Sequence, residues 1–122
     1  MYEVFIETSI SSAHCLDGYP GPCARVHGHN WRIKAVVSCR ELDERGFAVD
    51  FQDLKEQVEE ICSRLDHREL NRLDAFRDEN PTAENLARHI YRELSSRFTD
   101  GRIRIARVEV RETSDSGAVY RE

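Results

Sequence analysis

The chain has 122 residues, of which 39% are hydrophobic and 34% charged, a composition typical of a folded globular protein rather than a disordered one. Its length fits one domain, so we expect residues 1–122 to form a single unit. The 18 basic and 23 acidic residues give a net charge of −5, which argues against nucleic-acid binding, because that requires a basic face. An anionic small substrate is not excluded, since a local basic cluster can lie within an acidic protein.

No stretch of the sequence approaches the roughly 20 apolar residues that a membrane span requires. Residues 1–5 lack the basic start and apolar run of a signal peptide. We therefore expect a cytoplasmic protein with no membrane partner, in which the four cysteines stay reduced. They form no Cys-x-x-Cys pair, so neither a disulfide framework nor a zinc ribbon is indicated.

The hydrophobic periodicity predicts two strands, two helices and two further strands, in that order. One helix is expected after Asp50 and the other after Thr82, each with apolar residues at helical spacing. The predicted strands cover residues 2–10, 27–39, 103–110 and 118–120. This order predicts an α+β domain, a four-stranded antiparallel sheet with both helices on one face.

Two features of the predicted sheet need explanation. The apolar phase slips between Ile105 and Val108, which indicates a bulge or a late strand start. The face away from the helices carries Phe5 and Val36, and both sheet edges are open. Because open edges invite pairing with other chains, we expect a homo-oligomer.

Three histidines form a candidate metal site. His27 and His29 are two residues apart at the head of a strand, so their side chains point to the same side. His14, at the end of the first strand, supplies a third imidazole if the two strands pair as a hairpin. Three imidazoles and an open position are typical of a catalytic zinc ion, although a His-x-His pair also occurs by chance.

Cys23 precedes His27 by four residues, and two chemical roles are open to it. It could be a fourth ligand that closes a structural zinc site. It could instead be a free thiolate beside the metal, with its pKa lowered by zinc and by Arg25. The remaining cysteines are interpreted as small buried side chains without a chemical role: Cys15, Cys39 and Cys62.

Asp66 and His67 are adjacent at the end of the first predicted helix. The carboxylate could tune the histidine as a general acid or base, or the histidine could simply interact with the helix dipole. Glu112 continues the apolar phase of Val108 and Val110. A carboxylate on that face needs hydrogen-bond donors from the protein or from a ligand, unless the strand end reaches solvent.

Five motifs occur in order along the chain. The first is Cys23-x-x-x-His27-Gly28-His29-Asn30, preceded by Ser12-Ala13-His14. The others are Val49-Asp50-Phe51-x-x-Leu54-Lys55, Leu65-Asp66-His67-x-x-Leu70-Asn71, Asn80-Pro81-Thr82-x-Glu84 and Val110-x-Glu112-Thr113. Taken together, these motifs resemble the 6-pyruvoyl-tetrahydropterin synthase family. The short Cys23–His27 spacer and the ending Gly117-Ala118-Val119-Tyr120-Arg121 are similar to the family's bacterial branch, which makes 6-carboxytetrahydropterin for queuosine biosynthesis.

The resemblance implies the tunnelling fold, in which three chains close their sheets into a barrel and two trimers stack into a hexamer. It also implies a set of site residues: zinc on His14, His27 and His29, proton transfer by Cys23 with Asp66 and His67, and substrate binding by Glu112 and Thr113. The implied substrate is 7,8-dihydroneopterin triphosphate, which the bacterial branch converts to 6-carboxytetrahydropterin, acetaldehyde and triphosphate.

Two alternatives remain open at the level of sequence. One is a pyruvoyl-tetrahydropterin synthase, which keeps the carbon chain and releases no acetaldehyde. The other is a module that binds zinc or pterin without turnover, in which Cys23 closes the metal site.

Overall fold

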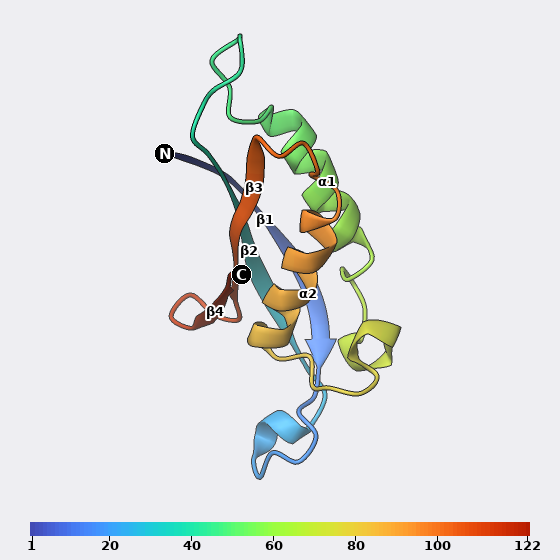
Figure 1. The fold of residues 1–122 in the computed structure, drawn as a ribbon. Coiled ribbons are helices and arrows are strands. Elements are labelled where there is room, and N and C mark those ends of the chain that lie inside the picture. Colours follow the sequence, from blue (N-terminus) through green and yellow to red (C-terminus); the bar gives the residue numbers. More distant parts are fainter.

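The computed structural model describes all 122 residues and shows one antiparallel sheet with two helices against it (Figure 1). The strands lie in the spatial order β1-β2-β3-β4. The elements are β1 (Tyr2–His14), β2 (His27–Cys39), α1 (Phe51–Ser63), α2 (Ala83–Ser95), β3 (Ile103–Arg111) and β4 (Gly117–Tyr120). The predicted α+β class and the order β-β-α-α-β-β are confirmed. No helix is both long and apolar enough to cross a bilayer.

β1 and β2 form one long hairpin whose register runs without interruption from Tyr2 opposite Cys39 to His14 opposite His27. Apolar and polar side chains alternate along the first half of β2 because every second residue faces the core. Trp31 and Ile33 lie in that core beneath the helices. The two strands are much longer than typical strands. Their far ends therefore project beyond the core, and the predicted histidines lie there.

Both helices begin directly after Asp50 and Thr82, as predicted, and these two residues cap them. The Asp50 side chain accepts a hydrogen bond from the Gln52 N–H, and the Thr82 side chain accepts one from the Asn85 N–H. Contacts of α1 are with β1 and α2, and contacts of α2 are with β3 and β4, so the two helices cover the same face of the sheet (Figure 1). The helical residues buried in this interface are Leu54, Val58, Ile61, Leu86, Ile90 and Leu94.

The slip in apolar phase is a β-bulge in β3. Val36 pairs with Arg107 while Val37 pairs with Ile105, which leaves Ala106 as the extra residue. The bulge returns Val108 to the helix-covered face after Ile105. Glu112, the first residue after β3, therefore lies in phase with Val108 and Val110, on the helix-covered side of the sheet.

The opposite face of the sheet is covered by charged side chains instead of helices. Arg107 forms ion pairs with Glu3 and Glu109, and the Lys34 ammonium lies 4.2 Å from the centre of the Phe5 ring. Half of the Phe5 side chain remains exposed. This face therefore has no hydrophobic cover within the single chain.

Candidate metal centre

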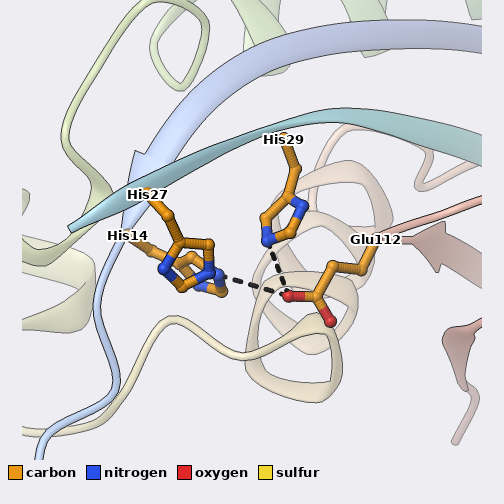
Figure 2. Close-up of side chains that lie close together, drawn as sticks. All are labelled: His14, His27, His29 and Glu112. Carbon is orange, nitrogen blue, oxygen red and sulfur yellow. Dashed lines mark ion pairs between the residues drawn. The ribbon is translucent and has the colours of Figure 1, made fainter. Parts of the chain in front are cut away.

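Side chains from three strands converge beyond the core (Figure 2). His14 comes from the end of β1, His27 and His29 from the start of β2, and Glu112 from just beyond β3. One candidate ligand atom from each of the four lies within 4.8 Å of all the others. The hairpin register explains the gathering of the histidines, since His14 pairs with His27 and His29 is two residues further along the same strand.

Backbone carbonyls orient two of the imidazole rings. His14 Nδ1 lies 2.8 Å from the Pro81 carbonyl oxygen, and His27 Nδ1 lies 2.8 Å from the Arg25 carbonyl oxygen. Because a carbonyl oxygen only accepts, each Nδ1 carries a proton, which leaves Nε2 as the ring nitrogen that could bind a metal. A hydrogen bond of this kind at the second ring nitrogen is the usual support of a metal-binding histidine.

The nitrogen atoms that face the centre are buried without a hydrogen-bond partner. Glu112 Oε1 lies 3.3 Å from His14 Nε2 and 2.9 Å from His29 Nε2, yet neither nitrogen forms a hydrogen bond. A short nitrogen–oxygen distance is not by itself a hydrogen bond, because the donor hydrogen must also point toward the acceptor. Buried polar atoms without a partner are costly, and a metal ion would satisfy both nitrogens at once.

The electrostatics of the centre also suit a cation. Burial is the main cause that lowers the pKa of His29, with smaller contributions from His14 and His27, while Glu112 opposes the shift. A lowered pKa keeps the imidazole neutral, which is the form that binds metal. Trp31 lies under the group, with its ring centre 4.9 Å from that of His14 and 5.1 Å from that of His29.

Cys23 is not part of the converging group. It lies in the short helical turn η1 (Pro22–Ala24) between β1 and β2, with a free and partly buried thiol. The fourth side chain of the group is that of Glu112, so the closed site with cysteine as its fourth ligand does not match this arrangement. The sequence interpretation had kept Glu112 apart from the metal, and the structure brings its carboxylate next to the histidines.

Asp66 and His67 are held against the end of β1. Asp66 Oδ1 accepts a hydrogen bond from the Ser11 N–H at 2.8 Å, and its Oδ2 lies 2.9 Å from His67 Nδ1. The Ser11 N–H, followed by His67, lowers the pKa of Asp66 and keeps the carboxylate ionised. His67 adopts a φ of 55°, a conformation uncommon for a residue with a side chain.

An open groove lies beside His67 at the ends of β1 and β2. His67 and His29 both line it, together with Asn30 and Ser11. The His67 side chain is 81% exposed, so its ring is available to a ligand in the groove. His14, His27 and Glu112 do not line this groove, so within one chain the structure does not bring the acid–base pair and the metal group to one cavity.

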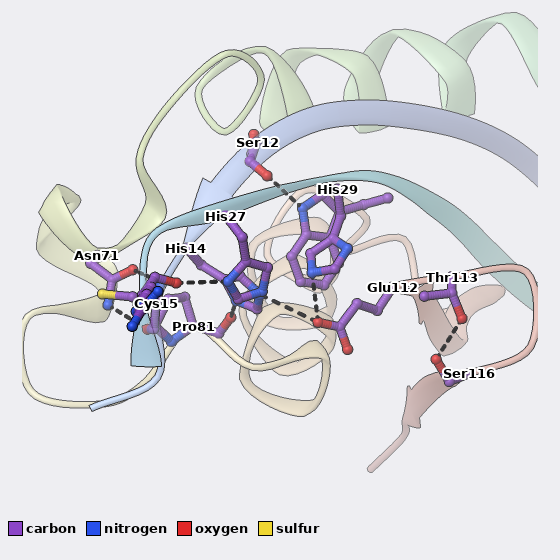
Figure 3. Close-up of polar contacts among 12 residues, drawn as sticks. Ser12, His14, Cys15, His27, His29, Asn71, Pro81, Glu112, Thr113 and Ser116 are labelled. Atoms are coloured by element: carbon purple, nitrogen blue, oxygen red, sulfur yellow. Dashed lines mark hydrogen bonds and ion pairs between the residues drawn. The ribbon is translucent and has the colours of Figure 1, made fainter. Parts of the chain in front are cut away.

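Thr113 lies in the turn between β3 and β4 and contributes nothing to the centre in this structure. Its hydroxyl lies 2.7 Å from the Ser116 hydroxyl, within the same turn (Figure 3). The residue is exposed. Its part in substrate binding therefore remains a proposal that depends on the resemblance alone.

Sequence reasoning missed two supports of the site, Trp31 and Pro81. Trp31 lies on the buried face of β2, and its indole N–H also donates to the Ser12 carbonyl oxygen at 3.2 Å. Pro81 contributes its carbonyl oxygen to His14 (Figure 3). No sequence signal marks a backbone carbonyl as a partner, because every residue has one.

Comparison with known proteins tests the resemblance directly. The family described as 6-pyruvoyl tetrahydropterin synthase matches residues 3–122, almost the whole chain. The chain belongs to this family. Its structure superimposes on that of the 6-pyruvoyl tetrahydropterin synthase of Caenorhabditis elegans with a TM-score of 0.85, at 26% identity and over 100% of this chain and 97% of that one.

Curated relatives in this family are similar over nearly their full length. The 6-carboxy-5,6,7,8-tetrahydropterin synthase of Synechocystis is 34% identical over 125 residues, which cover 98% of this chain and 93% of the relative. The enzyme of the same name from Bacillus subtilis is 34% identical over 127 residues, which cover 98% and 85%. The expectation of an enzyme of this family, with the tunnelling-type fold of one chain, is confirmed.

Proposed function

We propose that the chain is a zinc-dependent 6-carboxytetrahydropterin synthase. In this reaction 7,8-dihydroneopterin triphosphate is converted to 6-carboxy-5,6,7,8-tetrahydropterin, with release of acetaldehyde and triphosphate. The observation that carries the proposal is the convergence of His14, His27 and His29, with no hydrogen-bond partner for Nε2 of His14 and His29, in a chain whose relatives carry this enzyme name. Three imidazoles with room for a further ligand are the donor set of catalytic zinc.

In the proposed reaction the three imidazoles hold zinc at the end of the hairpin. Bound zinc would supply Lewis-acid stabilisation for negative charge that develops on the oxygens of the substrate side chain. Cys23 transfers the proton that starts the internal redox shift, and the pair of Asp66 and His67 relays a second proton at the groove. The short distance between the Asp66 carboxylate and His67 Nδ1 supports this pairing, because a carboxylate there stabilises the protonated imidazole.

Glu112 is proposed to bind the pterin. A carboxylate accepts two parallel N–H bonds, which matches the 2-amino-4-oxo pyrimidine edge of the ring system. In this role the Glu112 carboxylate, now 2.9 Å from His29 Nε2, would turn toward the substrate when the metal occupies the histidines. Thr113, the next residue, would add a hydroxyl contact to the same ring.

We further propose that the chain forms a homo-oligomer, a hexamer built from two trimers, and that it acts in the cytoplasm in queuosine biosynthesis. The oligomer is supported by the open outer edge of β1 over residues 2–9, where no backbone hydrogen bond is made outside the hairpin. The uncovered sheet face around Phe5 supports it as well, since a closed barrel would enclose that face.

Metal removal and restoration test the proposal. The protein is stripped with a chelator, reloaded with Zn²⁺ and assayed with 7,8-dihydroneopterin triphosphate, while its metal content is measured in parallel. We expect turnover to follow zinc up to one ion per chain, and His27→Ala to lose both zinc and turnover. Full turnover by the stripped protein would contradict the zinc-dependent function. The matched control is His89→Ala, because His89 lies on α2 outside the metal group.

A further inference from the structure

Residues 15–26 connect β1 to β2 and carry Cys23. Apart from η1, this loop has no regular structure of its own. Within it, the Leu16 N–H donates a hydrogen bond to the Cys23 carbonyl oxygen at 2.9 Å. The backbone position of Cys23 therefore depends on what holds Leu16.

Asn71 holds the residue before Leu16 (Figure 3). Its Oδ1 accepts a hydrogen bond from the Cys15 N–H at 2.9 Å, and its Nδ2 donates one to the Cys15 carbonyl oxygen at 2.9 Å. A single side-chain amide thus satisfies both backbone groups of one residue, as a neighbouring strand would. Both hydrogen bonds are partly buried.

Asn80 holds the residue after Leu16 in the same way. Its Oδ1 accepts from the Asp17 N–H at 2.9 Å, and its Nδ2 donates to the Asp17 carbonyl oxygen at 3.1 Å. These two asparagines make all the hydrogen bonds between residues 15–26 and segments outside the β1–β2 hairpin. Leu16, and through it Cys23, is fixed from both sides.

Both asparagines are themselves attached to the candidate site. Asn71 follows a segment, residues 67–69, that pairs in parallel with the end of β1. In this pairing the His67 N–H donates to the Ser11 carbonyl oxygen at 2.6 Å, and the Ala13 N–H donates to the Arg68 carbonyl oxygen at 2.9 Å. Asn80 precedes Pro81, whose carbonyl oxygen orients His14. One asparagine therefore links the loop to the acid–base pair, and the other links it to a metal ligand.

We infer that Asn71 and Asn80 are positioning residues that hold the loop of Cys23 in register with the metal centre. Both side-chain amides spend their hydrogen bonds on the backbone of Cys15 and Asp17, so we assign neither of them a direct action on a substrate. The effect on turnover rests on the proposed role of Cys23, whereas the effect on the loop does not. The two effects can therefore be measured separately.

The effect on the loop is measured without substrate on the full-length, zinc-loaded protein. In Asn71→Ala and in Asn80→Ala we expect amide hydrogen exchange of residues 15–26 and alkylation of the Cys23 thiol to become about tenfold faster, because two hydrogen bonds are lost in each. Mass spectrometry of peptides separates the cysteines. Burial raises the pKa of the Cys62 thiol to about 12, so its slow labelling serves as the internal reference.

Two further variants separate positioning from general loss of stability. Asn71→Asp keeps the acceptor for the Cys15 N–H but loses the donor, so we expect exchange between that of the wild type and that of Asn71→Ala. Gln57→Ala removes an amide that bonds Arg97 at 3.0 Å on the opposite part of the fold, and it should leave residues 15–26 unchanged. If Asn71→Ala does not fold, Asn71→Asp and Asn80→Ala give the same readout.

The effect on turnover is a fall in kcat of about tenfold or more, with zinc content and KM unchanged. Exchange and alkylation equal to those of the wild type in both alanine variants would overturn the inference, as would a fall in kcat fully explained by lost zinc. If the wild type itself turns over no pterin but the asparagine variants still show faster amide exchange in residues 15–26, the positioning role is upheld and the proposed function is rejected.

Discussion

Backbone carbonyl oxygens orient two of the three candidate metal ligands. His14 and His27 donate their Nδ1 protons to carbonyl oxygens, which leaves both Nε2 atoms directed to the same point. The histidines could be predicted from sequence because spacing on a strand and pairing in a hairpin are simple geometry. The position of Glu112 beside the histidines could not be predicted in the same way, because it depends on the bulge at Ala106. The slip in the apolar pattern indicates a bulge, but it does not fix the pairing of the residues that follow.

Cys23 is expected to be needed for proton transfer and not for metal binding. Because it lies outside the converging group, Cys23→Ala should keep zinc and pterin binding while kcat falls by about 10²–10⁴-fold, the usual contribution of general acid–base catalysis. Metal analysis and steady-state kinetics of the same sample check this. Loss of zinc in the variant would instead identify Cys23 as a ligand.

Glu112 has two possible roles that one substitution separates. If it binds the pterin, Glu112→Gln should raise KM by about 10–100-fold, because a charge-assisted hydrogen bond is lost, with the zinc content unchanged. The measurement pairs substrate titration with metal analysis. Weaker zinc binding, with KM unchanged once zinc is supplied in excess, would make Glu112 the fourth metal ligand, as its position 2.9 Å from His29 Nε2 allows.

At the scale of elements, the regular helices and strands were predictable and the segment between the helices was not. α1 and α2 have capping residues and apolar residues at helical spacing, which are local signals. Residues 66–80 contain only the short turns η2 (Leu70–Arg72) and η3 (Asp74–Phe76) and have no period to detect. Their place beside β1 is set by tertiary hydrogen bonds to Ser11 and Ala13, which a sequence pattern does not encode.

The start of α2 links helix stability to the metal centre. Thr82 caps the helix, while the carbonyl oxygen of Pro81 orients His14. Thr82→Ala should lower the free energy of unfolding by about 1 kcal/mol, the typical cost of a lost N-cap, and should weaken zinc binding slightly. Chemical denaturation of the stripped protein measures the first effect. Ser63→Ala, at the exposed end of α1, is the control and should change stability by less than about 0.5 kcal/mol. An equal loss in both variants would contradict the capping role.

At the scale of the whole molecule, the open edge of β1 is the feature that a single chain leaves unexplained. The N–H groups of Ser11, Ala13 and Cys15 point away from β2 toward residues 66–71, so by strand alternation the N–H of Glu7 also points outward, where nothing pairs with it. The edge is therefore covered only near the candidate site. Its remaining length is available to another copy of the chain.

Glu7→Pro tests this use of the edge. Proline removes the outward N–H without removing a hydrogen bond inside the hairpin, and edge strands tolerate it. Light scattering should give a multiple of 14.2 kDa for the wild type and a smaller assembly for the variant. Glu7→Ala is the matched control, since it also removes the ion pair with Arg32 but keeps the N–H. A wild-type mass of 14.2 kDa at micromolar concentration would refute the oligomer.

We propose that this chain cleaves the side chain of a pterin triphosphate at a three-histidine metal centre. Product analysis of the zinc-loaded wild-type protein with 7,8-dihydroneopterin triphosphate tests it most directly. We expect acetaldehyde and 6-carboxytetrahydropterin in equal amounts, and Cys23→Ala should form both at least about 100-fold more slowly. A pyruvoyl product without acetaldehyde would contradict the claim and assign the chain to the sister activity, and an unchanged substrate in the presence of bound zinc would leave only a binding function.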